Sequence, residues 1–433
     1  MHLRRPATAV AAATICVALG LTACGSDSDD SATGSTPGGK TTLTVSLFGT
    51  FGYKEAGLFD KYQADHPEIT IKYDSTEQEK NYWTALQTKL ASGSGASDVQ
   101  AIEVGRITDV AQNQGDKWLD LKGTSAGAQV ASYPAWKEAA ATTKDGAVLG
   151  LGTDIGPTGI CYRTDLMKAA GLPSDPAELA TKLTSWDDYI AMGEQFKSKA
   201  PKGAAWTDAA GGLYNVVVST ESKIYYDESG QLIWNTNPAV KHAYDLAAKA
   251  GQDGLTAKLG QFTPEWDSGF GKGSFATIAC PSWMIGYIKG KAGDAGSGKW
   301  NVTTLPGGVG GNWGGAYLSI PKQSKHQKQA ADLIKWLTDP EQQATVFNKV
   351  GNFPSNKGAF TLVADTKDDY FSGAAIGKVF GDIAASAPTQ IHGKDDGTIQ
   401  NQISTALQSV ETNHVAPDKA WATLNDTLKN QLG

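Results

Sequence analysis

The chain has 433 residues, of which 40% are hydrophobic, with 50 glycines, 12 tryptophans and a formal net charge of −7. This composition is typical of a globular protein, and the length exceeds what one hydrophobic core usually holds, so we expect two domains. Loss of Arg4 and Arg5 with an N-terminal signal would make the charge −9. Such an acidic balance argues against nucleic acid and anionic lipid surfaces as partners.

The first residues have the pattern of a secretory signal. Arg4 and Arg5 precede an apolar run over 6–21 that is short for a membrane-spanning helix. The tetrapeptide LTAC, which ends at Cys24, resembles a bacterial lipobox, in which cleavage before the cysteine leaves a lipid-bearing N-terminus. We therefore predict a signal peptide over 1–23 and a lipid anchor, such as palmitate, on Cys24 at the extracellular face of the cell membrane. Ordinary secretion with cleavage nearby is the alternative.

A polar segment, GSDSDDSATGSTPGGKTT, follows over 25–42 and contains no apolar residue larger than alanine. Such a segment cannot bury a core, so we expect residues 24–41 to carry the lipid and to form a flexible tether.

The remainder alternates between strand and helix patterns. The expected strands are 42–48, 68–75, 97–104, 275–280 and 316–321, and the expected helices are 54–67, 77–93, 185–196, 237–251, 328–340 and 418–432, with a mixed unit over 158–172. This spacing predicts βαβ units, and hence an α/β fold of two lobes, each with a mainly parallel sheet flanked by helices.

Two cysteines, Cys161 and Cys280, remain after the signal is cleaved and Cys24 is lipidated. An even pair outside the cytosol is most often a disulfide, so we predict a bond between them. A catalytic Cys280 would need a neighbouring histidine and an electropositive setting, and the local sequence supplies neither.

Motifs for catalysis are weak. The sequence G-x-S-x-G occurs at 123–127, but it lacks the strand before it and the helix after it that a nucleophilic Ser125 would need. The histidines have no metal-ligand spacing, and the glycine-rich stretches match neither a dinucleotide site nor a P-loop, so we expect no metal and no cofactor. A glycosidase with two carboxylates that lie far apart in the sequence stays open as an enzyme alternative.

The order of several segments resembles a known family. These segments are the LTAC signal, the polar tether, ASDVQAIEVGRITDVAQNQ, GLGTDIGPTGICYRTDLMKAAGL, SWDDYIAMGEQF, GKGSFATIACPSWMIGY and AYLSIPKQSKHQKQAADLIKWLTDPEQQATVFNKVGNFPSN. Together they resemble the extracellular solute-binding lipoproteins of sugar ABC importers (family 1, similar to maltose-binding proteins). Within that family they are most similar to actinobacterial binders of cello-oligosaccharides.

The resemblance implies a periplasmic-binding-protein fold whose two lobes are joined by hinge strands and close on a sugar. It implies a first lobe of 42–154 plus 312–356 and a second lobe of 155–311 plus 357–433. The expected function is to capture cellobiose or cellotriose in the cleft and deliver it to the permease subunits, as a monomer without enzymatic activity. Malto-, xylo- or chito-oligosaccharides are alternative ligands.

A sugar site needs flat aromatic rings for the apolar faces of the sugar and polar groups for its hydroxyls. The resemblance places Trp283, in the segment CPSW, under a sugar ring, while Trp313 lies between glycines that are too small to bury it. Glu103 and Arg106 follow a strand at a position where the family binds sugar hydroxyls. Seven other candidates follow from loops and crossing points of the chain: Gly49, Phe51, Glu77, Asp154, Trp206, Trp266 and Phe353.

Overall fold

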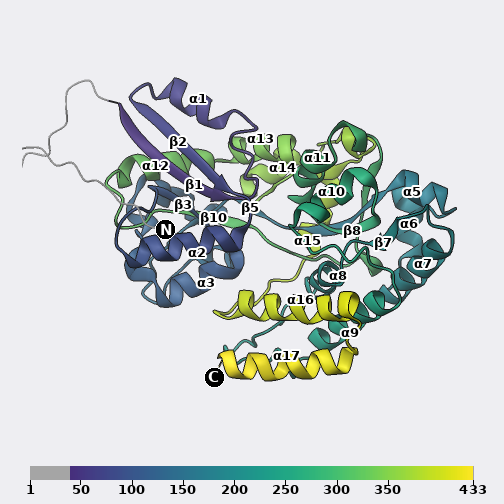
Figure 1. The fold of residues 1–433 in the computed structure, drawn as a ribbon. Coiled ribbons are helices and arrows are strands. Elements are labelled where there is room, and N and C mark those ends of the chain that lie inside the picture. Colours follow the sequence, from purple (N-terminus) through teal and green to yellow (C-terminus); the bar gives the residue numbers. More distant parts are fainter. Residues whose placement is uncertain (1–39, 433) are drawn as a thin grey trace, which may run out of the picture. The chain divides into compact units, whose positions relative to one another are not determined.

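A computed structural model describes residues 40–432 (Figure 1). The predicted signal peptide, Cys24 and the tether up to residue 39 lie outside the described residues. Among the described residues, no helix is long and apolar enough to cross a membrane.

The strands are β1 Thr41–Phe48, β2 Ile69–Thr76, β3 Val99–Glu103, β4 Leu151–Gly152, β5 Asp154–Ile155, β6 Thr158–Arg163, β7 Ala205–Thr207, β8 Phe275–Pro281, β9 Trp300–Thr303, β10 Ala316–Ser319 and β11 Phe353–Pro354.

A helix lies on every segment that the sequence predicts as helical, and the structure has further helices that the sequence did not predict. The helices are α1 Leu58–Asp65, α2 Glu79–Ala91, α3 Val104–Asn113, α4 Ala135–Ala140, α5 Thr164–Ala169, α6 Pro176–Lys182, α7 Trp186–Lys199, α8 Ala210–Val218, α9 Pro238–Gln252, α10 Pro264–Lys272, α11 Met284–Ala292, α12 Gln327–Leu337, α13 Pro340–Val350, α14 Phe360–Val363, α15 Ile376–Ser386, α16 Asp396–Asn413 and α17 Pro417–Leu432. The first helix begins four residues later than predicted, because residues 54–57 form turns that end at Gly57 in a left-handed conformation (φ 67°).

The first lobe is built on a five-stranded sheet with the order β2-β1-β3-β10-β4. Strands β2, β1 and β3 are parallel, as the βαβ pattern predicts. Strand β10 is antiparallel to both β3 and β4, so the prediction of a mainly parallel sheet holds for only part of this lobe. The reason is that β10 enters from the other lobe after a long excursion, and the βαβ rule covers only strands joined directly by a helix.

The second lobe is built on a four-stranded sheet with the order β7-β8-β6-β9. Only β7 and β8 are parallel, and β6 is antiparallel to both β8 and β9, so the mainly parallel prediction is wrong for this sheet. All six residues of β6 are buried. Alternate residues of β6 belong to two different hydrophobic clusters, so helices cover both faces of the sheet.

A disulfide joins Cys161 of β6 to Cys280 of β8, as the cysteine count predicts. The two strands are neighbours, with Cys161 opposite Ile278 and Cys280 opposite Gly159. The bond therefore links two central strands of the second lobe that are 119 residues apart in sequence.

The chain passes between the two sheets near residues 155 and 312. There β5 pairs with β11, and Pro157 forms a bridge with Asn312. The carboxylate of Asp154 accepts hydrogen bonds from the Thr153 hydroxyl (2.6 Å) and from the Ala316 amide (3.0 Å). Asp154 therefore joins the segment that leaves the first sheet to the segment that comes back to it near Ala316.

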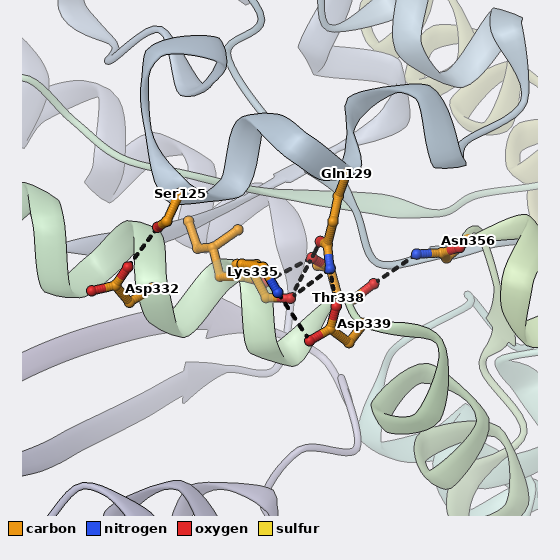
Figure 2. A network of polar contacts seen from close by, with 8 residues as sticks. Ser125, Gln129, Asp332, Lys335, Thr338, Asp339 and Asn356 are labelled. Carbon is orange, nitrogen blue, oxygen red and sulfur yellow. Dashed lines mark hydrogen bonds and ion pairs between the residues drawn. The ribbon is translucent and has the colours of Figure 1, made fainter.

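The serine of the G-x-S-x-G match has a structural partner (Figure 2). Ser125 begins a 3₁₀ helix, Ser125–Ser132, and its hydroxyl donates to Asp332 of α12 at 2.5 Å. In the same helix the Gln129 amide donates to the Lys335 carbonyl at 3.0 Å, and its oxygen accepts from the Thr338 hydroxyl at 2.6 Å. These hydrogen bonds join the 3₁₀ helix to α12, which follows the second crossing of the chain.

Candidate functional site

Polar and aromatic side chains from both lobes gather where strands end. In the first lobe, β2 leads into the loop before α2, and β3 runs directly into α3. In the second lobe, β8 leads into α11, and the loop before α10 lies beside it. Ligands of α/β sheets bind outside the carboxyl ends of such strands, so we place the candidate site there.

Three partly exposed rings form what we call the aromatic wall: Phe262, Trp283 and Trp313. The centroids of Phe262 and Trp283 are 6.3 Å apart at an interplanar angle of 29°, and those of Trp283 and Trp313 are 5.9 Å apart at 77°. The Trp283 indole N–H also donates to the Trp313 carbonyl at 3.0 Å. The wall therefore offers flat apolar surface in a fixed arrangement.

Phe262 is a wall residue that the sequence analysis missed. Its backbone has φ 63°, a left-handed conformation that a bulky residue adopts rarely and that costs about 1–3 kcal/mol. Buried Trp266 packs against its ring at 5.1 Å and is itself held by a hydrogen bond to Asp208 (2.8 Å). Phe262 lies directly before Thr263, the N-cap of α10. Because a helix start fixes the conformation of the loop before it, this position was the feature of the sequence that could have identified Phe262.

Glu103 ends β3 and Arg106 lies in the first turn of α3, and Glu103 pairs with Ala316 of β10, three residues after Trp313. Glu103 is the N-cap of α3, and its carboxylate accepts from the Gly105 amide at 2.6 Å. Burial and the nearby Glu79 raise the pKa of Glu103 to about 7, although the Gly105 amide, Arg106 and His392 act in the opposite direction. Its carboxyl group can therefore be protonated or ionised near neutral pH, and so can donate or accept a hydrogen bond.

Arg106 is held by the first lobe and reaches the second. Its guanidinium forms an ion pair with Glu79 (3.3 Å) and lies over the Trp83 ring at 5.6 Å. A Cβ atom at Gly397 would lie 2.7 Å from Arg106 Nη1, so the guanidinium lies against the first turn of α16. A side chain at Gly397 would therefore require the Arg106 guanidinium to shift from this position.

The loop before α16 contributes a histidine that the sequence analysis also missed. His392 Nδ1 lies 2.9 Å from Asp396 Oδ2, which fixes the ring orientation. The spacing His392 to Asp396, four residues apart across a helix start, was the available signal.

Several other predicted site residues lie inside the lobes. Trp206 is 1% exposed and packs against Tyr189 and Phe196, while Trp266 is fully buried behind Phe262. Their rings have no free face for a ligand, because each fills the core next to a strand or helix of the second lobe. Phe353 is 1% exposed and packs against Phe347. These side chains do not join the aromatic wall.

The remaining predicted residues have protein partners of their own. Both contacts of the Asp154 carboxylate are structural, as described above, and burial raises its pKa while Lys137 opposes that effect. Phe51 is buried against Phe48. Gly49 has φ 54° and donates its amide to the Thr76 carbonyl at 3.0 Å, so its conformation shapes the loop. Glu77 forms an ion pair with Lys291 of α11.

A cavity of about 880 Å³ lies elsewhere, along the crossing segments and α15. Trp136, Phe353 and Phe360 are its aromatic lining, and it shares no residue with the aromatic wall. Ile155 of β5 and Phe353 of β11 line it beside α15, whereas the wall lies just after the carboxyl end of β8, so we place the candidate site at the wall.

Solved structures define the class of fold. A crystal structure described as an extracellular solute-binding protein of family 1 is 39% identical, with a TM-score of 0.75, and the match covers 89% of this chain and 98% of that chain. The ABC transporter associated binding protein from B. animalis subsp. lactis Bl-04, solved with β-1,6-galactobiose, has a TM-score of 0.76 at 20% identity over 90% of this chain and 97% of that chain. The protein therefore has the two-lobed α/β fold of periplasmic binding proteins.

Sequence comparison gives the family. Residues 57–371 match the bacterial extracellular solute-binding proteins, and the chain belongs to this family. A lactose-binding protein from Rhizobium radiobacter is 30% identical over 203 residues, which are 45% of this chain and 44% of that protein. The chain thus spans about half the length of the curated relatives it matches first.

Proposed function

We propose that this chain is the extracellular substrate-binding component of an ABC importer and that it captures an oligosaccharide for delivery to the membrane permease. The aromatic wall is the observation that carries this proposal. Phe262, Trp283 and Trp313 present flat apolar surface, and Glu103, which pairs with Ala316 three residues after Trp313, and Arg106 supply polar groups. A sugar ring has the complementary surface, since its C–H faces are apolar and its rim carries hydroxyls.

The proposed binding step is closure of the two lobes around the sugar. We assign residues 42–154 plus 312–356 to the first lobe and 155–311 plus 357–433 to the second. The crossings near 155 and 312 and the separate clusters on the first-lobe sheet and on one face of the second-lobe sheet support this division, although Ala344, Phe347 and Phe353 pack with the second lobe. A ligand shifts such an equilibrium only through contacts that are better in the closed form, and here both lobes supply site residues.

We propose cellobiose or cellotriose as the sugar, on the resemblance of the chain to binders of cello-oligosaccharides. Two of the relatives named above carry lactose or β-1,6-galactobiose in their names, so galactosides join malto-, xylo- and chito-oligosaccharides as the competing ligands. We further propose that Cys24 carries the lipid anchor, that the protein is a monomer, and that it releases its sugar unchanged.

A binding panel tests this proposal. The mature protein is titrated by calorimetry with di- to tetrasaccharides of the cello-, malto-, xylo- and chito- series and with lactose, while tryptophan fluorescence is recorded. We expect saturable binding of cellotriose or cellobiose and recovery of the intact sugar by chromatography. Hydrolysed product would instead indicate a glycosidase, and no binding by any sugar of the panel would contradict the proposal.

A further inference from the structure

Two ion pairs that share one lysine link the two lobes beside the candidate site. Lys291 of α11 forms an ion pair with Asp267 of α10 at 2.7 Å and a second one with Glu77, in the loop between β2 and α2 of the first lobe. The Tyr287 hydroxyl donates to Asp267 at 2.5 Å. Lys291 is therefore held by its own lobe in a position to bind a carboxylate of the other.

A neutral contact lies directly beside the charged one. Gln78 follows Glu77 in the first lobe, and its side-chain amide donates to the Phe262 carbonyl at 3.1 Å. Phe262 is the wall residue with the left-handed backbone, so the conformation that presents its ring also presents its carbonyl to the other lobe. Two adjacent residues of one loop thus contact two elements of the second lobe.

The exposed fractions of these side chains indicate which ion pair stays formed within the second lobe and which one can break when the lobes separate. The side chains of Lys291 and Asp267 are 28% and 20% exposed, whereas that of Glu77 is 61% exposed. Burial opposes the charge on Lys291, but the carboxylates of Asp267 and Glu77 outweigh it and raise the pKa of the amine. Lys291 stays protonated at neutral pH, and Glu77 can return to water when the lobes part.

We propose that Lys291 is a positioning residue for closure, which holds Glu77 and thereby keeps the lobes together over the bound sugar. This inference rests on the proposed function, because it requires lobes that close around a ligand. A contact that exists only in the closed form slows opening, so the residue acts on the rate of sugar release and does not contact the sugar itself.

Chemical cross-linking tests the contact without any sugar. A water-soluble carbodiimide joins an amine to a carboxylate only where the two are in contact, and peptide mass spectrometry locates the product. We expect a link between Glu77 and Lys291. Lys249 is a matched control, since it pairs with Asp253 and with Glu194 within the second lobe. A link between Lys249 and Glu194 without any link between Glu77 and Lys291, with and without cellotriose, overturns the proposal.

A double-mutant cycle tests the effect on release. Stopped-flow dissociation of cellotriose is measured for wild type, Glu77→Gln, Lys291→Gln, the double variant and the control Glu194→Gln. Loss of a partly exposed ion pair should make dissociation roughly two- to fivefold faster in each single variant. The double variant should dissociate at the same rate as the single variants, because each of them already removes the pair. Added salt should speed release from wild type but not from the variants.

The same cycle can contradict the inference. Unchanged dissociation in both single variants, or effects that simply multiply in the double variant, would show that the pair does not hold the lobes. If no sugar of the panel binds, the proposed function fails while the cross-link still decides whether Lys291 and Glu77 meet.

Discussion

Trp283 is fixed at the end of β8 by contacts on several sides. It is the residue before α11, its indole N–H is bonded to the Trp313 carbonyl, and its ring faces Phe262. Phe262 stacks along one face of the ring at an offset and Trp313 lies at 77° to it, and the Trp283 ring remains partly exposed. A rigid aromatic side chain with little freedom left to lose is well suited to bind a ligand.

Replacement of this ring should weaken sugar binding. Trp283→Ala removes the centre of the aromatic wall, and we expect a loss of about 1–3 kcal/mol of binding free energy for cellotriose by calorimetry. Trp336→Ala is the matched control, because Trp336 is also partly buried but lies on α12 against Tyr62, outside the wall. Equal affinity of wild type and Trp283→Ala, with the fold intact by circular dichroism, would remove Trp283 from the site.

Three aromatic residues show how far the sequence predicts whether a side chain is exposed. Glycines around Trp313 predicted an exposed ring, and the structure leaves it partly exposed. Similar small neighbours surround Trp206, yet it is buried, because Tyr189 and Phe196 come from α7, which its own segment does not reveal. The position of Phe262 depends on a left-handed backbone, which a sequence pattern does not predict for phenylalanine.

At the scale of elements, the helices and strands predicted from the sequence are present, but many others were not predicted, and neither was the pairing of the strands. Hydrophobic periodicity reports which face of an element is buried and does not report strand direction. The first three strands are parallel because helices join them directly. Strand β6 lies between two antiparallel partners that return to it from distant segments, so local patterns could not predict its neighbours.

The bond between β6 and β8 should stabilise the second lobe. A loop of 119 residues is closed by Cys161 and Cys280, and the chain-entropy account of such a loop gives about 4–5 kcal/mol. We expect the double variant Cys161→Ala and Cys280→Ala to lose about 2–5 kcal/mol of unfolding free energy in urea. A reducing agent should destabilise wild type and leave this variant unchanged.

Thiol labelling checks the bond itself. Wild-type mature protein is alkylated in denaturant without a reducing agent, and we expect no label on either peptide by mass spectrometry. Two alkylated cysteines would show that the bond is absent in solution.

At the scale of the whole molecule, four carboxyl groups that are buried or, at Glu103, partly buried have raised pKa values. Burial is the largest cause for each, and it raises the pKa of Glu103 and of Glu411 to about 7 and also raises the pKa values of Asp154 and Asp208. Asp154 ties the crossing segments, Asp208 holds Trp266, and Glu411 joins α16 to α8. Burial of ionisable groups therefore recurs where distant parts of the chain meet.

These groups set a pH dependence of stability with a definite sign. In the unfolded chain a glutamate titrates near its ordinary value, so between about pH 4.5 and 7 the folded protein holds protons that the unfolded chain has released. The stabilisation from a raised pKa is complete below that window and is lost as the pH rises through about 7. Each such group contributes a slope of at most about 1.4 kcal/mol per pH unit.

Glu411 is suited to test this, because it is 2% exposed and its carboxylate accepts from the Ala210 amide at the start of α8 (2.9 Å). Glu411→Gln keeps an oxygen for that amide but cannot ionise. We expect the unfolding free energy of wild type, measured in urea, to fall between pH 5 and pH 7.5, and the fall to be smaller in Glu411→Gln. The control Glu194→Gln changes an exposed glutamate and should follow wild type. Identical pH profiles for wild type and Glu411→Gln would mean that Glu411 titrates in the folded protein as it does in the unfolded chain.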